Sequence, residues 1–148
     1  RNIGAKSASN ERLVFLDADI IVSNTILTKI KNSSFTIGSS KVKPNSSKLK
    51  HRIFMNIKTN LNYFGFSSGL IFCDKNLFNR VGGFNELQSK GEDGQFLRRA
   101  KRKGNFGVVN AYVFNHMRRF ERLGYSKIIF YWTKEFFFKS KKEYESIR

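Results

Sequence analysis

Residues 1–22 read RNIGAKSASNERLVFLDADIIV, and this stretch decides the expected fold. Small and polar residues dominate 1–10, a pattern typical of the end of a helix. Residues 12–16 form a short, almost fully apolar run, which is typical of a strand buried on both faces. Asp17 and Asp19 follow this strand directly. Two hard oxygen ligands at the carboxyl end of a strand favour a divalent-metal site, and the alternative is a solvated acidic turn.

The rest of the chain alternates between strand-like and helix-like segments. The segments expected to form strands are 35–38, 67–73, 106–109 and 111–114, and those expected to form helices follow Ser23, follow Asp74, and span 92–103 and 120–139. Ser23 and Asp74 are expected to cap their helices, and Gly104 is expected to end the third helix. Gly82–Gly83 predicts a tight turn, and residues 43–50 predict a polar loop. This alternation predicts an α/β layered domain.

The composition limits the classes of function. The chain has 148 residues, with 28 Lys and Arg against 11 Asp and Glu, which gives a formal net charge of +17. This balance implies an anionic partner: nucleic acid, an anionic membrane surface or a phosphorylated substrate. Because Cys73 is the single cysteine, we expect neither an internal disulfide nor a Cys-built zinc site. No run of 18 apolar residues occurs, so no transmembrane helix is predicted, and a reducing, cytosolic compartment is expected.

Four segments, in order, resemble the motifs of family-2 glycosyltransferases. Residues 1–22 resemble the family's Arg-Asn-x-Gly helix and the strand that ends in its Asp-x-Asp motif. SSGLIFCDKNLFNRVGGFNE at 67–86 resembles its strand, helix and Gly-Gly-Phe turn, and GEDGQFLRRAKRKG at 91–104 resembles its Glu-Asp helix. VFNH at 113–116 is similar to the strand that ends in a family histidine. RRFERLGY at 118–125 is also similar to a segment of bacterial members.

This resemblance implies a GT-A, Rossmann-like fold and the inverting transfer of a sugar from a nucleotide-diphosphate sugar to an acceptor hydroxyl. It also implies that Asp17 and Asp19 hold a Mn²⁺ or Mg²⁺ ion, with Asp19 as the firmer ligand and Asp17 directed toward the ribose or sugar of the donor. Such an ion would stabilise the charge on the leaving diphosphate. Asp93 matches the family's general base, which takes the acceptor proton. His116 is a further metal-ligand candidate, or a strand-end histidine satisfied by its neighbours.

Four other candidate residues each keep a structural alternative. Glu92 either contacts the acceptor or completes a capping box with Ser89. Arg1 contacts the diphosphate or nucleotide of the donor, or is merely solvated. Gly69 and Gly83 let the backbone approach the donor sugar, and for Gly83 a tight turn that requires glycine is an equal alternative.

Residues 1–120 are expected to form part of a GT-A catalytic domain. The family's first strands, and the acidic residue that reads the nucleotide base, have no counterpart in this sequence. We therefore expect a domain whose N-terminal part is missing, belonging to a longer protein or to a split or decayed gene product. A sheet truncated in this way exposes an edge strand that is open to pairing with another chain.

Residues 121–148 are expected to form a basic, aromatic helix. Its apolar stripe consists of Tyr125, Ile128, Ile129, Trp132 and Phe136. One interpretation packs this stripe on the domain core. The other places the helix, with the five lysines between 127 and 142, on an anionic membrane surface. A lipid-linked acceptor or a cell-surface glycan precursor makes both compatible, with the protein peripheral at the inner face of the membrane.

Two other classes of function remain open. A basic nucleic-acid-binding module would use its charge for phosphate contacts and its Phe rings for stacking. The basic residues are spread along the chain without a known nucleic-acid motif, so we expect no nucleic-acid partner. The other class is an inactive remnant that serves as a binding or scaffold piece, because a fold does not guarantee a function.

Overall fold

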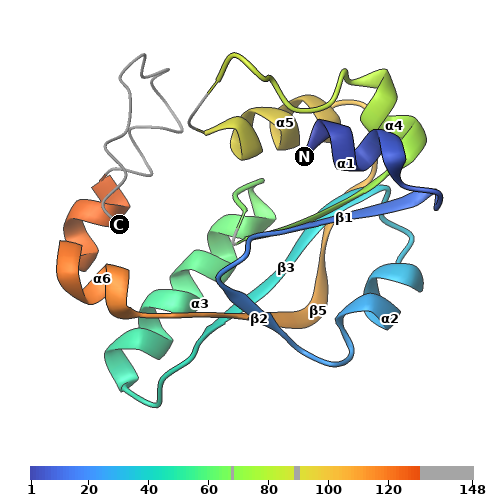
Figure 1. The fold of residues 1–148 in the computed structure, drawn as a ribbon. Helices are drawn as coiled ribbons and strands as arrows, with labels where there is room; N and C mark the ends of the chain where they lie inside the picture. The colour runs from blue at the N-terminus through green and yellow to red at the C-terminus, as the bar shows by residue number, and fades with distance from the viewer. Residues whose placement is uncertain (68, 89–90, 131–148) are drawn as a thin grey trace.

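A five-stranded mixed sheet in the order β1-β4-β3-β5-β2 organises the protein (Figure 1). The computed structural model describes residues 1–67, 69–88 and 91–130. The strands are β1 (Arg12–Leu16), β2 (Ile20–Val22), β3 (Ile37–Pro44), β4 (Leu70–Asp74) and β5 (Phe106–Asn115). β3 and β5 are parallel, and the other neighbouring strands are antiparallel. The α/β class is therefore confirmed.

Helices cover both faces of this sheet. The described helices are α1 (Asn2–Ser7), α2 (Ile26–Lys31), α3 (Leu49–Tyr63), α4 (Lys75–Arg80), α5 (Glu92–Lys101) and α6 (Arg118–Leu123). One buried cluster joins the sheet to α1, α4 and α5, and a second joins it to α2, α3 and α6. Side chains of β4 alternate between the two clusters. The strand that is buried on both faces is therefore β4, whose first four residues are all buried.

β1 differs from the sequence prediction in its burial. It was expected to be buried on both faces, but Leu13 is its single buried residue and Leu16 is exposed. The reason is its position at the edge of the sheet, where β4 is its one strand neighbour among the described residues. β1 is thus an edge strand of the described sheet. That another chain pairs with it stays a prediction.

The sequence did not indicate α3, the longest described helix. Its buried side includes three polar residues: His51, Lys58 and Asn62. Its exposed side includes the apolar residues Leu49 and Ile53. Because both faces mix polar and apolar residues, no clear helical period is visible. The polar loop expected at 43–50 is consequently too long, since β3 extends to Pro44 and α3 begins at Leu49.

The two strands expected on either side of Asn110 are one strand, β5. Its register against β3 jumps there, since Ser40 pairs with Val109 while Lys41 pairs with Tyr112. A bulge of this kind keeps a long strand continuous while breaking its alternation. The break in the apolar pattern at Asn110 was therefore real, but it marks an irregularity within a strand.

Two of the three predicted helix caps are wrong. Thr25, and not Ser23, is the N-cap of α2; Ser23 instead bonds Tyr112 of β5 through its backbone N–H and its hydroxyl oxygen. The C-cap of α5 is Arg102. Gly104 is needed for close packing, because a Cβ there would lie 2.4 Å from Leu77 of α4. Asp74 is the N-cap of α4, although its side chain pairs with Arg12 and makes no capping bond.

The predicted helix over 120–139 is interrupted. α6 ends at Leu123, Gly124 has a φ of 83°, and residues 125–130 are helical again. Ile128 is buried and Tyr125 and Ile129 pack against the same cluster, so the described part of the predicted stripe faces the core. The remainder of the stripe lies outside the described residues. None of the described helices combines the length and the hydropathy needed to cross a membrane.

Candidate functional site

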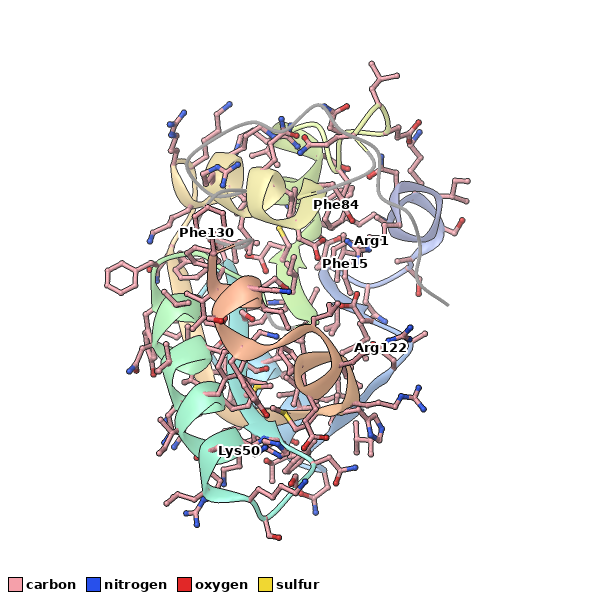
Figure 2. All side chains as sticks on the ribbon, turned by 90° about the vertical axis from the view of Figure 1, so that its left-hand side faces the viewer. Arg1, Phe15, Lys50, Phe84, Arg122 and Phe130 are labelled. Atoms are coloured by element: carbon pink, nitrogen blue, oxygen red, sulfur yellow. The ribbon has the colours of Figure 1, made fainter. Side chains whose placement is uncertain are left out.

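Arg1 brings together three carboxylates from two distant parts of the chain. Its Nη2 lies 2.9 Å from Oδ1 of Asp17, and its Nη1 bonds both Asp93 and Glu92, with 3.2 Å to Oε1 of Glu92. The guanidinium also lies 5.2 Å from the centre of the Phe84 ring, a cation–π contact. Figure 2 shows Arg1 beside Phe84 and Phe15. We call Arg1, Asp17, Glu92 and Asp93 the carboxylate cluster.

Asn2 fixes the position of Arg1. Its amide oxygen accepts a hydrogen bond from the backbone N–H of Phe84, and its Nδ2 donates to the carbonyl of Phe84 and to Glu86, both at 2.8 Å. This double contact to one residue attaches α1 to the turn after Gly83. A side-chain amide that satisfies both backbone groups of a neighbour specifies a unique orientation. Arg1 is thereby held over Phe84, facing α5.

Gly69 and the crossing of the chain after β1 place Asp17. The backbone N–H of Asp17 donates to the carbonyl of Gly69 at 2.9 Å. Gly69 has a φ of 91°, and a Cβ on it would lie 3.2 Å from Oδ2 of Asp17 and 3.0 Å from Ile20. A side chain would therefore obstruct the passage of the chain from β1 to β2 across the start of β4. Glycine is required there for both reasons.

Glu92 and Asp93 come from the start of α5, which a group of rings holds against the sheet. Phe96 is fully buried and contacts the rings of Phe15, Phe78 and Phe84, with centroids 4.5–6.4 Å apart. The helix begins at Glu92, after Gly91 in the left-handed conformation. In a capping box the glutamate is the third helical residue. Glu92 is the first and bonds Arg1, so the predicted capping role is not supported; Ser89 lies outside the described residues.

Asp93 has a perturbed proton affinity. Burial raises the pKa of its carboxyl from 3.8 to about 6; Arg1 opposes this rise, while Glu92 and Asp17 add to it. The folded protein thus holds this proton more tightly than the unfolded chain. The contribution of Asp93 to stability therefore falls as the pH rises from 3.8 to about 6. Near neutral pH the group is mostly ionised, which is the state a general base requires.

Asp19 points to a different place from Asp17. It lines an open hollow of about 560 Å³ together with His116, which follows β5, and with Lys48, His51 and Glu121. The two carboxylates of the Asp-x-Asp motif therefore face separate environments. Asp17 pairs with Arg1, while Asp19 is exposed and available to a ligand beside the histidine that the resemblance singled out.

A polar network forms one wall of this hollow. His51 is buried, and its Nε2 lies 3.1 Å from Oε1 of Glu121 while its Nδ1 lies 2.8 Å from the hydroxyl of Ser46. A carboxylate can only accept, so Nε2 carries the proton and Nδ1 accepts from Ser46 when the ring is neutral. Lys48 also bonds Glu121, and this hydrogen bond lowers the pKa of that carboxyl. The network fixes α6 against the start of α3.

The hollow contains two side chains of the kinds that bind divalent metals. Among the described residues, no three His, Cys, Asp or Glu side chains are placed to hold a metal by themselves. Asp19 and His116 supply one carboxylate and one imidazole, a donor set that suits Mn²⁺ and, less well, Mg²⁺. Such ions are commonly bound by one or two protein carboxylates together with substrate phosphates. Lys48 and Arg118 line the same hollow and add positive charge to it.

The structure therefore divides the predicted site residues into two groups. The cluster holds Arg1, Asp17, Glu92 and Asp93, with Gly69 beneath Asp17; the hollow holds Asp19 and His116. Gly83 belongs to neither: it is buried with a φ of 62°, and a Cβ on it would lie 2.8 Å from Asn2, which supports the alternative of a tight turn. Sequence reasoning missed Asn2, Lys48 and the His51–Glu121 pair. Asn2, beside Arg1, and Glu121, within RRFERLGY, lie in quoted motifs and carried a signal, whereas Lys48 and His51 did not.

Comparisons with known proteins add no family to these observations. Neither protein-family models nor curated proteins match this chain. Any statement about function therefore depends on the geometry of the site and on the resemblance of its motifs.

The titration of Asp93 provides a test of the carboxylate cluster. A carbon-detected NMR titration should give a midpoint near 6 for its carboxyl. Arg1→Gln should move this midpoint upward, because the guanidinium favours the charged form, and Glu92→Gln should move it downward, because a negative neighbour is removed. A midpoint that stays unchanged in Arg1→Gln would show that the cluster is not assembled in solution.

Proposed function

We propose that this chain is part of an inverting, metal-dependent glycosyltransferase of the GT-A fold, similar to family 2. In this proposal the chain carries the general base and the residues that bind the metal ion of the donor. The observation that carries the proposal is the contact of Arg1 with both Asp17 and Asp93. These residues come from three motifs that lie up to 92 positions apart. A chance match of short motifs would not be expected to gather their charged residues at one place.

The proposed donor is a nucleotide-diphosphate sugar, whose diphosphate lies in the hollow of Asp19 and His116. These two side chains would hold a Mn²⁺ or Mg²⁺ ion there, and the ion would stabilise charge on the leaving diphosphate. Lys48 and Arg118 line the same hollow and attract the phosphates. Asp17 is two residues before Asp19 and shares Arg1 with Asp93, and it would orient the ribose or sugar through its carboxylate.

Asp93 is the proposed base. In the transfer step, the acceptor oxygen forms a bond to the anomeric carbon as the bond to the diphosphate oxygen breaks. The acceptor proton goes to Asp93, and the electron pair of the broken bond leaves with the diphosphate. Arg1 contacts Oδ1 of Asp93, which leaves Oδ2 to receive the proton. The acceptor is a hydroxyl of a glycan or of a lipid-linked sugar, since either supplies the nucleophile.

Binding of a nucleoside diphosphate tests the donor side of the proposal. Calorimetry with UDP and with GDP should show binding that requires Mn²⁺, while Mn²⁺ alone should give little heat, because the hollow supplies only part of a metal site. Asp19→Asn and His116→Ala should each weaken the metal-dependent binding by roughly tenfold or more, the effect expected for a lost ligand or its partner. Asp74→Asn, which removes a carboxylate paired with Arg12, is the matched control. Equal heats for the control and for Asp19→Asn would contradict the assignment.

Transfer activity tests the role of Asp93. In the enzyme that contains this chain, Asp93→Asn should lower kcat by roughly 100- to 10,000-fold and leave the affinity for the donor nearly unchanged, because a base acts in the transition state. Glu92→Gln should reduce kcat less, since this carboxylate acts through Arg1. An inactive Glu92→Gln variant beside an active Asp93→Asn variant would reverse the two roles.

A further inference from the structure

A row of apolar side chains lies on the solvent side of α3. Leu49, Ile53 and Ile57 follow one another at four-residue spacing, and Phe64 continues the row at the end of the helix. Their exposed fractions are 68%, 54%, 46% and 69%. This spacing places them on one helix face, opposite the side that packs on β3 and β5. Neither the sequence patterns nor the proposed catalytic role accounts for this exposure.

Phe130 is a further exposed apolar residue among the described ones. It is 70% exposed and lies in the helical segment after α6, where Figure 2 labels it. α3 and α6 lie next to each other on this side of the molecule, since the rings of Phe54 and Phe120 are 5.3 Å apart. Large apolar side chains gathered on one exposed helix face are typical of a site of interaction with a protein or a membrane. We call Leu49, Ile53, Ile57 and Phe64 the apolar row.

The charges around the apolar row are positive. No acidic residue occurs between Asp19 and Asp74, whereas Lys50 and Arg52 are exposed on the flanks of α3. Lys50 is at one end of the helix in Figure 2, and Lys101 reaches the carbonyl of Tyr63 at the other end. The nearby acid of α6, Glu121, is already paired with Lys48 and His51.

We infer that the apolar row is a docking surface for an anionic lipid bilayer. An apolar helix face bordered by Lys and Arg lies in the interface of such a bilayer, with its apolar side chains among the acyl chains and its cations at the anionic headgroups. An acidic protein surface would match the cations but not the apolar row, and a neutral apolar one would match the row but not the cations. An anionic bilayer matches both, and we therefore favour it as the partner. Every residue of this docking surface is one that the structure describes.

Docking of α3 on a bilayer also sets where the hollow lies relative to the membrane. Lys48 is the N-cap of α3 and lines the hollow that contains Asp19 and His116. A bilayer against α3 therefore lies next to that hollow. This second step rests on the proposed function, and it assigns the acceptor to the lipid-linked class. The bilayer docking itself does not depend on catalysis.

Co-sedimentation with vesicles tests the docking surface. The full chain should bind vesicles of phosphatidylcholine with phosphatidylglycerol, should bind phosphatidylcholine alone far less, and should be released as the salt concentration rises. The Ile53→Ser, Ile57→Ser double variant should have an affinity for the anionic vesicles that is lower by roughly tenfold or more, because two half-exposed apolar side chains are lost. The matched control is Ile21→Ser, Leu27→Ser, whose residues are 51% and 62% exposed on β2 and α2. Equal binding by the two double variants, or equal binding to neutral vesicles, overturns the inference.

A fluorescent label identifies the surface that meets the lipid. Ile53→Cys can be labelled selectively with an environment-sensitive dye, because Cys73 is fully buried. Anionic vesicles should shift the emission to the blue, and the same dye at Leu27→Cys should not respond. A dye at position 53 that does not respond while the protein co-sediments overturns the inference, because another surface then binds. Emission that is already blue-shifted without vesicles also overturns it, because the apolar row is then covered by protein.

Discussion

The contacts of Arg1 are the interaction on which the candidate site depends. Without a cation between them, Asp17, Glu92 and Asp93 would repel one another at the junction of β1 and α5. Arg1 can pair with all of them because the guanidinium offers several donors in a fixed plane. The position of Arg1 follows from Asn2, whose side-chain amide forms hydrogen bonds with the backbone of Phe84. The site therefore joins α1, β1 and α5 through one side chain.

A local excess of negative charge stands out in this strongly basic chain. The carboxylate cluster contains three acids and one arginine, while the chain as a whole carries a formal charge of +17. The surrounding positive field attracts phosphates and anionic surfaces. The cluster keeps a carboxylate ionised near neutral pH in spite of its burial, because Arg1 opposes the rise in the pKa of Asp93. In the proposed function, attraction of anions and removal of a proton are thus carried out by separate groups of residues.

The parts of the fold that could be predicted from sequence are those with one consistent pattern. β4 is a pure apolar run, and α5 has its buried residues Phe96, Leu97 and Ala100 at helical spacing. α3 could not be predicted from the apolar pattern, because His51 and other polar residues face inward while apolar residues face outward. β2 could not be predicted either, because a segment of three residues is too short to show a period.

The candidate residues of the site were identified by their motifs, but their grouping was not. Adjacent residues of a motif were expected to act together, whereas Asp17 and Asp19 face different environments. The separation depends on how the chain crosses the start of β4 over Gly69, which is a tertiary feature. The solvated state considered for Arg1 was likewise wrong, because its partners lie 16 to 92 positions away along the chain.

A double-mutant cycle between Arg1 and Asp93 tests the central claim most directly. The free energy of unfolding would be measured for Arg1→Gln, Asp93→Asn and the double variant at about pH 8, where the Asp93 carboxyl is ionised. The account predicts a coupling energy of roughly 0.5–3 kcal/mol, whereas the same cycle between Arg1 and Asp74, which pairs with Arg12, should be additive within about 0.5 kcal/mol. Additive effects of Arg1→Gln and Asp93→Asn would contradict it, because Arg1 would then not hold the carboxylates together.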